Sequence, residues 1–258
     1  MRVQRSRLLS LALALALPAT ASAQDTRPTV AILNFNGSAL VKNAAEYGPL
    51  SKGIADMLIT ELSGSPGLRV VERDRIQALL EEQNLAKQGR IDEATAVKLG
   101  KILGAKHMVM GGFLIDPKET LRLDARAVDV ETSQIIYTES VTGKSENILT
   151  LITDLGQKMN ARMKLPPIKL SKIQPPEEAP GAAPVRQGSN EAASRPAGNK
   201  FKAVMLMSRA LNAKDQGDMQ TAVALLKQAN TEAPLPRTNE LLAQYTASPG
   251  KGTERRAS

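Results

Sequence analysis

The stretch from Leu68 to Gln83 changes from a strand-like to a helix-like pattern of apolar positions. Leu68, Val70 and Val71 follow a Pro-Gly turn as a short apolar run, which predicts a buried strand. Ile76, Leu79 and Leu80 then recur at helical spacing on one face. We therefore expect a strand that passes directly into a covering helix, with Asp74 placed to cap the first turn of that helix.

The same two periods extend the prediction over the preceding and following residues. Apolar runs predict strands, and apolar positions every three to four residues predict helices. Before the stretch just described, we expect a strand over 29–35, a polar loop over 36–47 and a helix opened by Pro49. After it, we expect a helix over 93–103 that is begun by Asp92-Glu93 and ended by Gly104. Strands over 107–115, 121–130 and 134–141 follow, and then a helix that is capped by Ser145 and runs to Met163.

The three later strands form an expected antiparallel meander. In the second of them, Leu121, Leu123, Ala125 and Ala127 alternate with polar residues, and the alternation slips at Val128, which predicts a bulge. The pair Gly111-Gly112 inside the first predicts a bulge or a close backbone approach. The predicted class is α/β (α+β), with a mixed sheet of about five strands covered by helices over residues 24–163.

The chain begins with the pattern of a secretory signal peptide over residues 1–23. Arg2, Arg5 and Arg7 precede an apolar run from Leu8 to Leu17, and Ala21-Ser22-Ala23 is a small-residue cleavage site. The run is shorter than the roughly 20 residues that a spanning helix needs. We expect export to the periplasm, cleavage before Gln24 and at most peripheral contact with a membrane. The sequence has no cysteine, so it offers neither a disulfide nor a lipidated cysteine.

The formal charge of +8 is unevenly distributed. Residues 24–163 carry 17 basic and 18 acidic side chains, whereas residues 164–258 carry 14 and 8. The domain is therefore close to neutral, and only three Tyr and three Phe are available to stack on bases. Nucleic-acid binding usually shows as a basic stripe on a fold, often with aromatic residues. The sequence therefore predicts no nucleic-acid partner.

Composition separates the C-terminal region into three parts. Residues 164–199 are rich in Pro, Ala, Gly and Ser without an apolar period, which predicts a linker. Residues 200–247 are expected to hold two short helices, over 200–213 and 220–232, and residues 248–258 a disordered basic tail. These two helices form an expected hairpin that resembles a single tetratricopeptide repeat in the placement of its small and apolar residues, which are Leu206, Ala210, Ala222, Leu226, Ala229 and Pro234.

Candidate catalytic chemistry is sparse. The single histidine, His107, begins an apolar strand with no second histidine, cysteine or evident carboxylate pair nearby in the sequence, which favours a structural role. Gly143-Lys144-Ser145 ends like a phosphate-binding loop, but Thr138 stands where the first glycine of that motif is required. The prediction is a protein that is not an enzyme, with no catalytic, metal-binding or cofactor-binding residues and no cofactor.

Four segments resemble the CsgG family, the curli assembly and transport component of the bacterial outer membrane, and they occur in that family's order. They cover about half the chain, between residues 29 and 160, and are Val30–Phe35, Val70–Asp74 with Glu82-Gln83, Leu99–Ala105, and Arg126–Val130 with Thr132 and Ile135. The resemblance implies a compact α/β domain that acts through protein contacts in the envelope. In CsgG itself it implies a lipid-anchored, ring-shaped secretion channel with long membrane-spanning hairpins.

Two classes of function follow from the resemblance. The first is a soluble periplasmic protein that helps assemble an envelope or curli-type secretion machine, through contacts with envelope or secretion proteins or with its own copies. The alternative is an oligomeric channel subunit of the outer membrane. Here short turns join the meander strands, and Arg122, Asp124 and Arg126 occupy the outward face, whereas a lipid-facing strand needs an apolar face. A third class, a hydrolase or nucleotide-binding enzyme, requires a site around His107 or Ser145.

Overall fold

The computed structural model describes residues 25–40, 44–85, 91–168, 172–173 and 199–247. Within them the chain forms a six-stranded sheet and seven α-helices. The predicted α+β class is confirmed. The signal peptide, most of the predicted linker and the basic tail lie outside the described residues.

The sheet is mixed, with strand order β3-β1-β4-β5-β6 and with β2 also paired to β4. Its parallel part joins β1 to β3, and both β1 and β2 to β4, whereas β4, β5 and β6 form the antiparallel meander. The strands are β1 (Thr29–Ile32), β2 (Asn36–Ala39), β3 (Arg69–Val70), β4 (His107–Ile115), β5 (Thr120–Asp129) and β6 (Ile135–Lys144).

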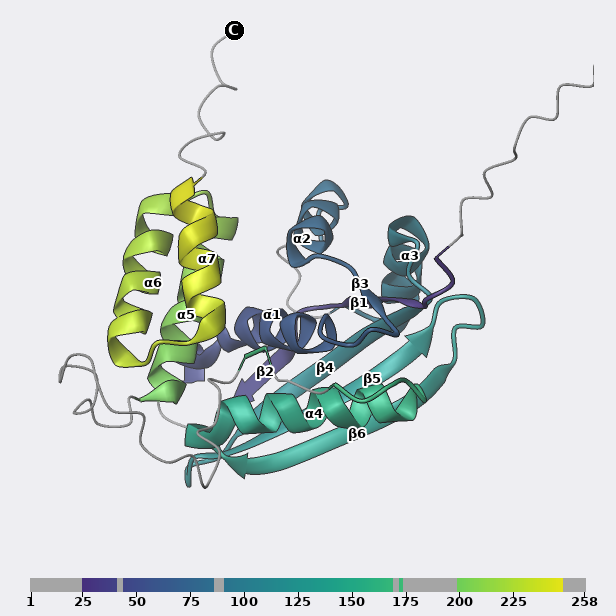
Figure 1. Ribbon diagram of the computed structural model, residues 1–258, viewed down its shortest axis with the longest axis horizontal. Coiled ribbons are helices and arrows are strands. Elements are labelled where there is room, and N and C mark those ends of the chain that lie inside the picture. The colour runs from purple at the N-terminus through teal and green to yellow at the C-terminus, as the bar shows by residue number, and fades with distance from the viewer. Residues whose placement is uncertain (1–24, 41–43, 86–90, 169–171, 174–198, 248–258) are drawn as a thin grey trace, which may run out of the picture.

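Helices cover one face of the sheet more fully than the other. In the α/β domain they are α1 (Leu50–Leu62), α2 (Arg73–Glu82), α3 (Glu93–Leu103) and α4 (Ile148–Arg162), with the short 3-10 helices η1 (Ala44–Tyr47) and η2 (Ser145–Asn147). Figure 1 shows α1 and α4 side by side across the sheet. The alternating set of β5, Leu121, Leu123, Ala125 and Ala127, is buried on this covered face as predicted.

The bulge and the close approach predicted from the sequence are both present. The register of β5 against β6 shifts between Ala127 and Val128. A Cβ atom added to Gly111 would lie 2.4 Å from the ring of Phe35 and 2.6 Å from the carbonyl oxygen of Asp124. Glycine at this position therefore lets Phe35 pack directly against the backbone of the sheet.

Several local predictions were wrong. The expected polar loop over 36–47 contains β2 and η1. Asp74 does not cap α2, because the N-cap position belongs to Glu72, and Ser145 does not cap α4, whose N-cap is Asn147. Ser145 instead lies buried in η2, where its backbone N–H donates to the carbonyl oxygen of Glu119 over 2.8 Å.

The C-terminal region contains three helices where the sequence predicted two. They are α5 (Lys200–Asp215), α6 (Met219–Glu232) and α7 (Pro236–Ala247), and Figure 1 shows them as one group beside the end of α1. Five of the six residues that suggested a tetratricopeptide repeat are buried, and Pro234 is exposed. The repeat-like character of this group stays a prediction.

Candidate functional site

The face of the sheet opposite α1 and α4 is largely open. α3 covers one end of it, where Gly100 packs against Met108 and Val130. Beyond that end, residues of β2, β4, β5 and β6 line a hollow of about 670 Å³. The hollow is lined by Asn36, Met110, Gly111, Gly112, Arg122, Asp124, Ala125, Arg126, Thr138, Glu139 and Ser140.

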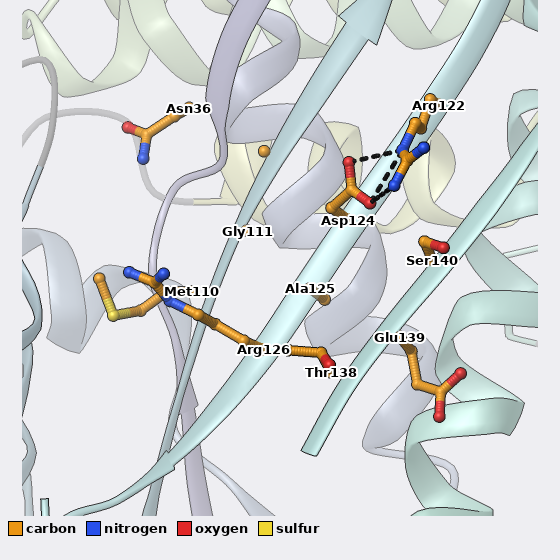
Figure 2. A pocket seen from close by; sticks show the side chains of 11 residues that line it. Asn36, Met110, Gly111, Arg122, Asp124, Ala125, Arg126, Thr138, Glu139 and Ser140 are labelled. Carbon is orange, nitrogen blue, oxygen red and sulfur yellow. Dashed lines mark hydrogen bonds and ion pairs between the residues drawn. The ribbon is translucent and has the colours of Figure 1, made fainter. Parts of the chain in front are cut away.

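Four charged residues line the hollow, and Figure 2 shows Arg122, Asp124 and Arg126 on β5 and Glu139 on β6. Arg122 and Asp124 are two residues apart on β5, so they project to the same face, and Arg122 donates to the Asp124 carboxylate at 2.8–3.0 Å. Arg126 projects from the same face opposite Met110 of β4, and its nearest acid is Glu93 of α3 at 4.0 Å. Exposed pairs of this kind stabilise a fold little, so their polarity remains available to a partner.

The hollow offers charge and hydrogen-bonding groups rather than a reactive centre. Ser140 and Thr138 lie at its β6 side, and no histidine lines it. Among the described residues, no group of three or more His, Asp or Glu side chains is arranged to hold a metal ion. This arrangement suits recognition of a polar surface. The alternation along β5 predicted which of its residues face outward, but no pattern in the sequence predicted the hollow.

His107 lies away from the hollow, at the start of β4. Its Nδ1 is 3.8 Å from a carboxylate oxygen of Asp129, a neighbour that the sequence reasoning missed. Desolvation by burial lowers the pKa of His107 even though Asp129 acts to raise it, so the neutral form is favoured at neutral pH. Asp129 also accepts hydrogen bonds from the backbone N–H groups of Glu131 and Thr132, which organise the turn into β6.

Ser145 lies in η2 and does not line the hollow. Gly143 and Lys144 are residues of β6 rather than of a loop that opens a helix, so this segment lacks the architecture of a phosphate-binding loop. The structure thus places His107 and Ser145 in separate parts of the domain.

A second group of charged side chains lies where α5–α7 meet the α/β domain. Asp215 of α5 accepts hydrogen bonds from Lys52 of α1 and Arg73 of α2. Asp56 of α1 accepts two hydrogen bonds, both of 2.8 Å, from Arg237 of α7. Each of these acids is paired with cations across the interface, so the group joins the C-terminal helices to the domain.

No helix in the described part of the chain is both long and apolar enough to cross a membrane. No curated protein sequence matches this chain.

Solved structures of similar fold include the C-terminal domain of LpoB from Salmonella enterica, lipoprotein GNA1162 from Neisseria meningitidis and a PelC dodecamer from Paraburkholderia phytofirmans. The LpoB domain is 13% identical with a TM-score of 0.37, over 45% of this chain and 82% of that one. GNA1162 is 15% identical with a TM-score of 0.36, over 45% and 79%. PelC is 13% identical with a TM-score of 0.29, over 53% and 87%. These similarities are low.

The family model described as "Curli production assembly/transport component CsgG" matches residues 12–114. In the structure this range includes β1–β3, α1–α3 and β4 up to its penultimate residue. The predicted resemblance to the CsgG family is therefore confirmed.

Proposed function

We propose that this protein is a periplasmic, non-enzymatic member of the CsgG-like group that acts in cell-envelope assembly or curli-type secretion through protein contacts. The family match supports the setting, because the matching family is one of assembly and transport. The open sheet face supports the mode of action. It presents Arg122, Asp124 and Arg126 around a hollow that has no evident reactive group.

The uncovered face is the single observation that carries the proposal. An antiparallel sheet that packs one face on a core commonly leaves the other to solvent. Here that second face is concave and carries charges of both signs, which gives a partner both shape and charge to match. We infer that an envelope or secretion protein docks on this hollow, with its own charges opposite those of β5.

Photo-crosslinking in cells tests the proposal. A photoreactive residue replaces Arg126 in the hollow, and a matched control replaces Lys158, an exposed residue of α4 on the opposite face. We expect position 126 to give a discrete adduct with another envelope protein and position 158 to give none. No adduct at position 126, or the same adducts at both positions, would contradict docking on this face.

The non-enzymatic part of the proposal has a separate test. A strain lacking the protein is complemented with the variants His107→Ala and Ser145→Ala, and thermal unfolding checks that each variant folds. We expect both folded variants to correct fully the envelope defect of the strain that lacks the protein. Failure of a folded His107→Ala or Ser145→Ala protein to correct that defect would instead indicate a reaction at that residue.

A further inference from the structure

The sheet ends in one long edge strand. β6 is the outermost strand of the meander, and Figure 1 shows it on the side of the sheet away from α2 and α3. β3, at the other end of the strand order, is only two residues long. A long edge presents a row of backbone N–H and C=O groups without partners, which is a template for pairing with another chain.

The register of β6 against β5 identifies the residues that carry those outward groups. The backbone N–H of Ser145 donates to the carbonyl oxygen of Glu119 over 2.8 Å, so these two residues form a hydrogen-bonded pair. Because such pairs alternate along an antiparallel ladder, the odd-numbered residues from Tyr137 to Gly143 bond to β5, up to the register shift that skips Ile136. The backbone groups that point outward are those of the even-numbered residues Thr138, Ser140, Thr142 and Lys144.

Most of β6 lacks the features that usually protect an edge, and its bulge lies at Ile136, near one end of the strand. It contains no proline, and its single lysine, Lys144, is the last residue of the strand. Glu139 forms an ion pair with Arg162 of α4 and so points to the covered face rather than along the edge. At the other end, Ile135 and Ile136 are 48% and 44% exposed. The middle of the strand is rich in residues that favour β structure.

The outward residues are arranged symmetrically about Ser140. Thr138 and Thr142 lie two positions to either side of it, so the series reads Thr, Ser, Thr in both directions. An antiparallel copy centred on the same serine would place each Thr138 opposite a Thr142 and would place Tyr137 opposite the small Gly143. Cross-strand Thr and Ser pairs are favourable, and an aromatic side chain can cover a glycine on the neighbouring strand.

The charges select the same register. A copy centred on Glu139 would place two carboxylates directly opposite each other, which is unfavourable. In the register centred on Ser140, Glu139 lies opposite Val141 instead. We propose that two copies of this chain pair through β6, antiparallel and centred on Ser140, so that their sheets become one continuous sheet.

This pairing rests on the strand alone and not on the proposed function. It also leaves Arg122, Asp124 and Arg126 uncovered, because they lie on the face of the sheet rather than along its edge. A second copy, rather than an unrelated extended peptide, is favoured because the symmetry about Ser140 makes the edge complementary to itself.

Engineered cysteines test both the pairing and its register, since the chain contains no cysteine of its own. Residues of a hydrogen-bonded pair have Cα atoms about 5.5 Å apart, which is within the range that a disulfide spans. We expect Ser140→Cys to form a disulfide-linked dimer under mild oxidation. Thr142→Cys alone should not, because its own copy is displaced by roughly 13 Å along the strand. A mixture of Thr138→Cys and Thr142→Cys proteins should cross-link, whereas each variant alone should remain monomeric on a denaturing gel.

The unmodified protein provides the second measurement. Its mass in solution should rise from monomer to dimer with concentration, Ser140→Thr should retain the dimer, and Ser140→Lys should raise the dimer dissociation constant at least several-fold. A monomer at every concentration, a dimer unaffected by Ser140→Lys, or equal cross-linking at positions 140 and 142 would overturn the proposal. If the protein is a monomer, the edge of β6 remains free to pair with an extended segment of another protein. The crosslinked adduct at position 126 tests the proposed function separately.

Discussion

The carboxylate of Asp215 in α5 binds the guanidinium group of Arg73 in α2 through both of its oxygens, at 3.1 and 2.5 Å. Both side chains are only 6% exposed, and Lys52 of α1 donates to the same carboxylate over 2.7 Å. Three helices from two parts of the chain thus meet at one buried acid. The C-terminal helices are therefore docked on the α/β domain.

Asp215→Asn is expected to weaken this docking. The substitution removes the negative charge and leaves Asp74, at 3.8 Å, as the remaining carboxylate paired with the buried Arg73, so the expected loss is at most about 3 kcal/mol. Hydrogen exchange of the α5 backbone should become faster, while exchange in β4 and β5 changes little. The control Asp154→Asn removes an exposed pair with Lys158 and should cost less than about 0.5 kcal/mol. Equal exchange in the two variants would mean that Asp215 does not hold α5 in place.

Acid should release the same helices. Burial alone would raise the pKa of Asp215, but hydrogen bonds from Arg73 and Lys52 outweigh it and hold the pKa below its ordinary value. A carboxylate with a lowered folded-state pKa stabilises the fold above its unfolded pKa of about 3.9, and this contribution is lost as the pH falls through the folded pKa.

The measurement is hydrogen exchange of α5 between pH 5 and strong acid, corrected for the intrinsic effect of pH. We expect protection of α5 to fall as the solution becomes more acidic than about pH 4. The Asp215→Asn protein should show a shallower fall, because its residue 215 no longer titrates. An identical pH dependence in both proteins would assign the acid response to other carboxylates.

The sequence predicted those parts of the fold whose apolar period is strong. The face of α1 marked by Leu50, Ile54 and Met57 is buried, and so is the alternating set of β5 that includes Leu121 and Leu123. These patterns are local, and burial on one face is the main cause of each. The order of helices and strands could therefore be predicted without knowledge of any contact between distant residues.

Elements held by backbone pairing or by distant partners could not be predicted in this way. β2 has the sequence Asn-Gly-Ser-Ala, which carries no apolar signal, and its parallel pairing with β4 forms the strand. Asp74 is of a residue type that often caps helices, yet its carboxylate binds Lys214, which is far away in the sequence. The hollow and the contacts of Asp215 with Lys52 and Arg73 likewise depend on the packing of segments that are distant in the sequence.

Close packing between α1 and α5 gives a prediction about glycine. A Cβ atom added to Gly53 would lie 1.8 Å from Oγ of Ser208 and 2.9 Å from its Cβ. Gly53→Ala should therefore separate the two helices and lower the melting temperature, although alanine in an exposed helix would stabilise it by about 1 kcal/mol. The second variant, Ser208→Gly, removes both clashing atoms and leaves the Ser208 Cα at 3.4 Å.

The double variant Gly53→Ala with Ser208→Gly should recover part of the lost stability. Recovery would be incomplete because glycine inside α5 costs about 1 kcal/mol. Thermal unfolding followed by circular dichroism measures all three proteins. If Gly53→Ala is as stable as the unmodified protein, then α5 does not pack on α1 at this distance.

The ion pair between Asp56 and Arg237 gives the last prediction. Asp56 is 1% exposed in α1 and accepts two hydrogen bonds from Arg237 of α7, which also donates to Glu240. Arg237→Leu leaves the buried carboxylate of Asp56 without this partner and should destabilise the protein by about 3–5 kcal/mol, whereas Asp56→Leu leaves Arg237 paired with Glu240 and should cost less. The double substitution removes both charges together and should cost much less than the sum of the two single changes.

A double-mutant cycle from chemical denaturation measures this coupling, with Lys158→Leu and Asp154→Leu as a matched cycle on an exposed pair. We expect a coupling energy above about 1.5 kcal/mol for Asp56 with Arg237, and below about 0.5 kcal/mol for the exposed pair. Additive single effects at Asp56 and Arg237 would mean that α7 is held to α1 by apolar contacts such as those of Leu241, and that the buried pair contributes no attraction of its own.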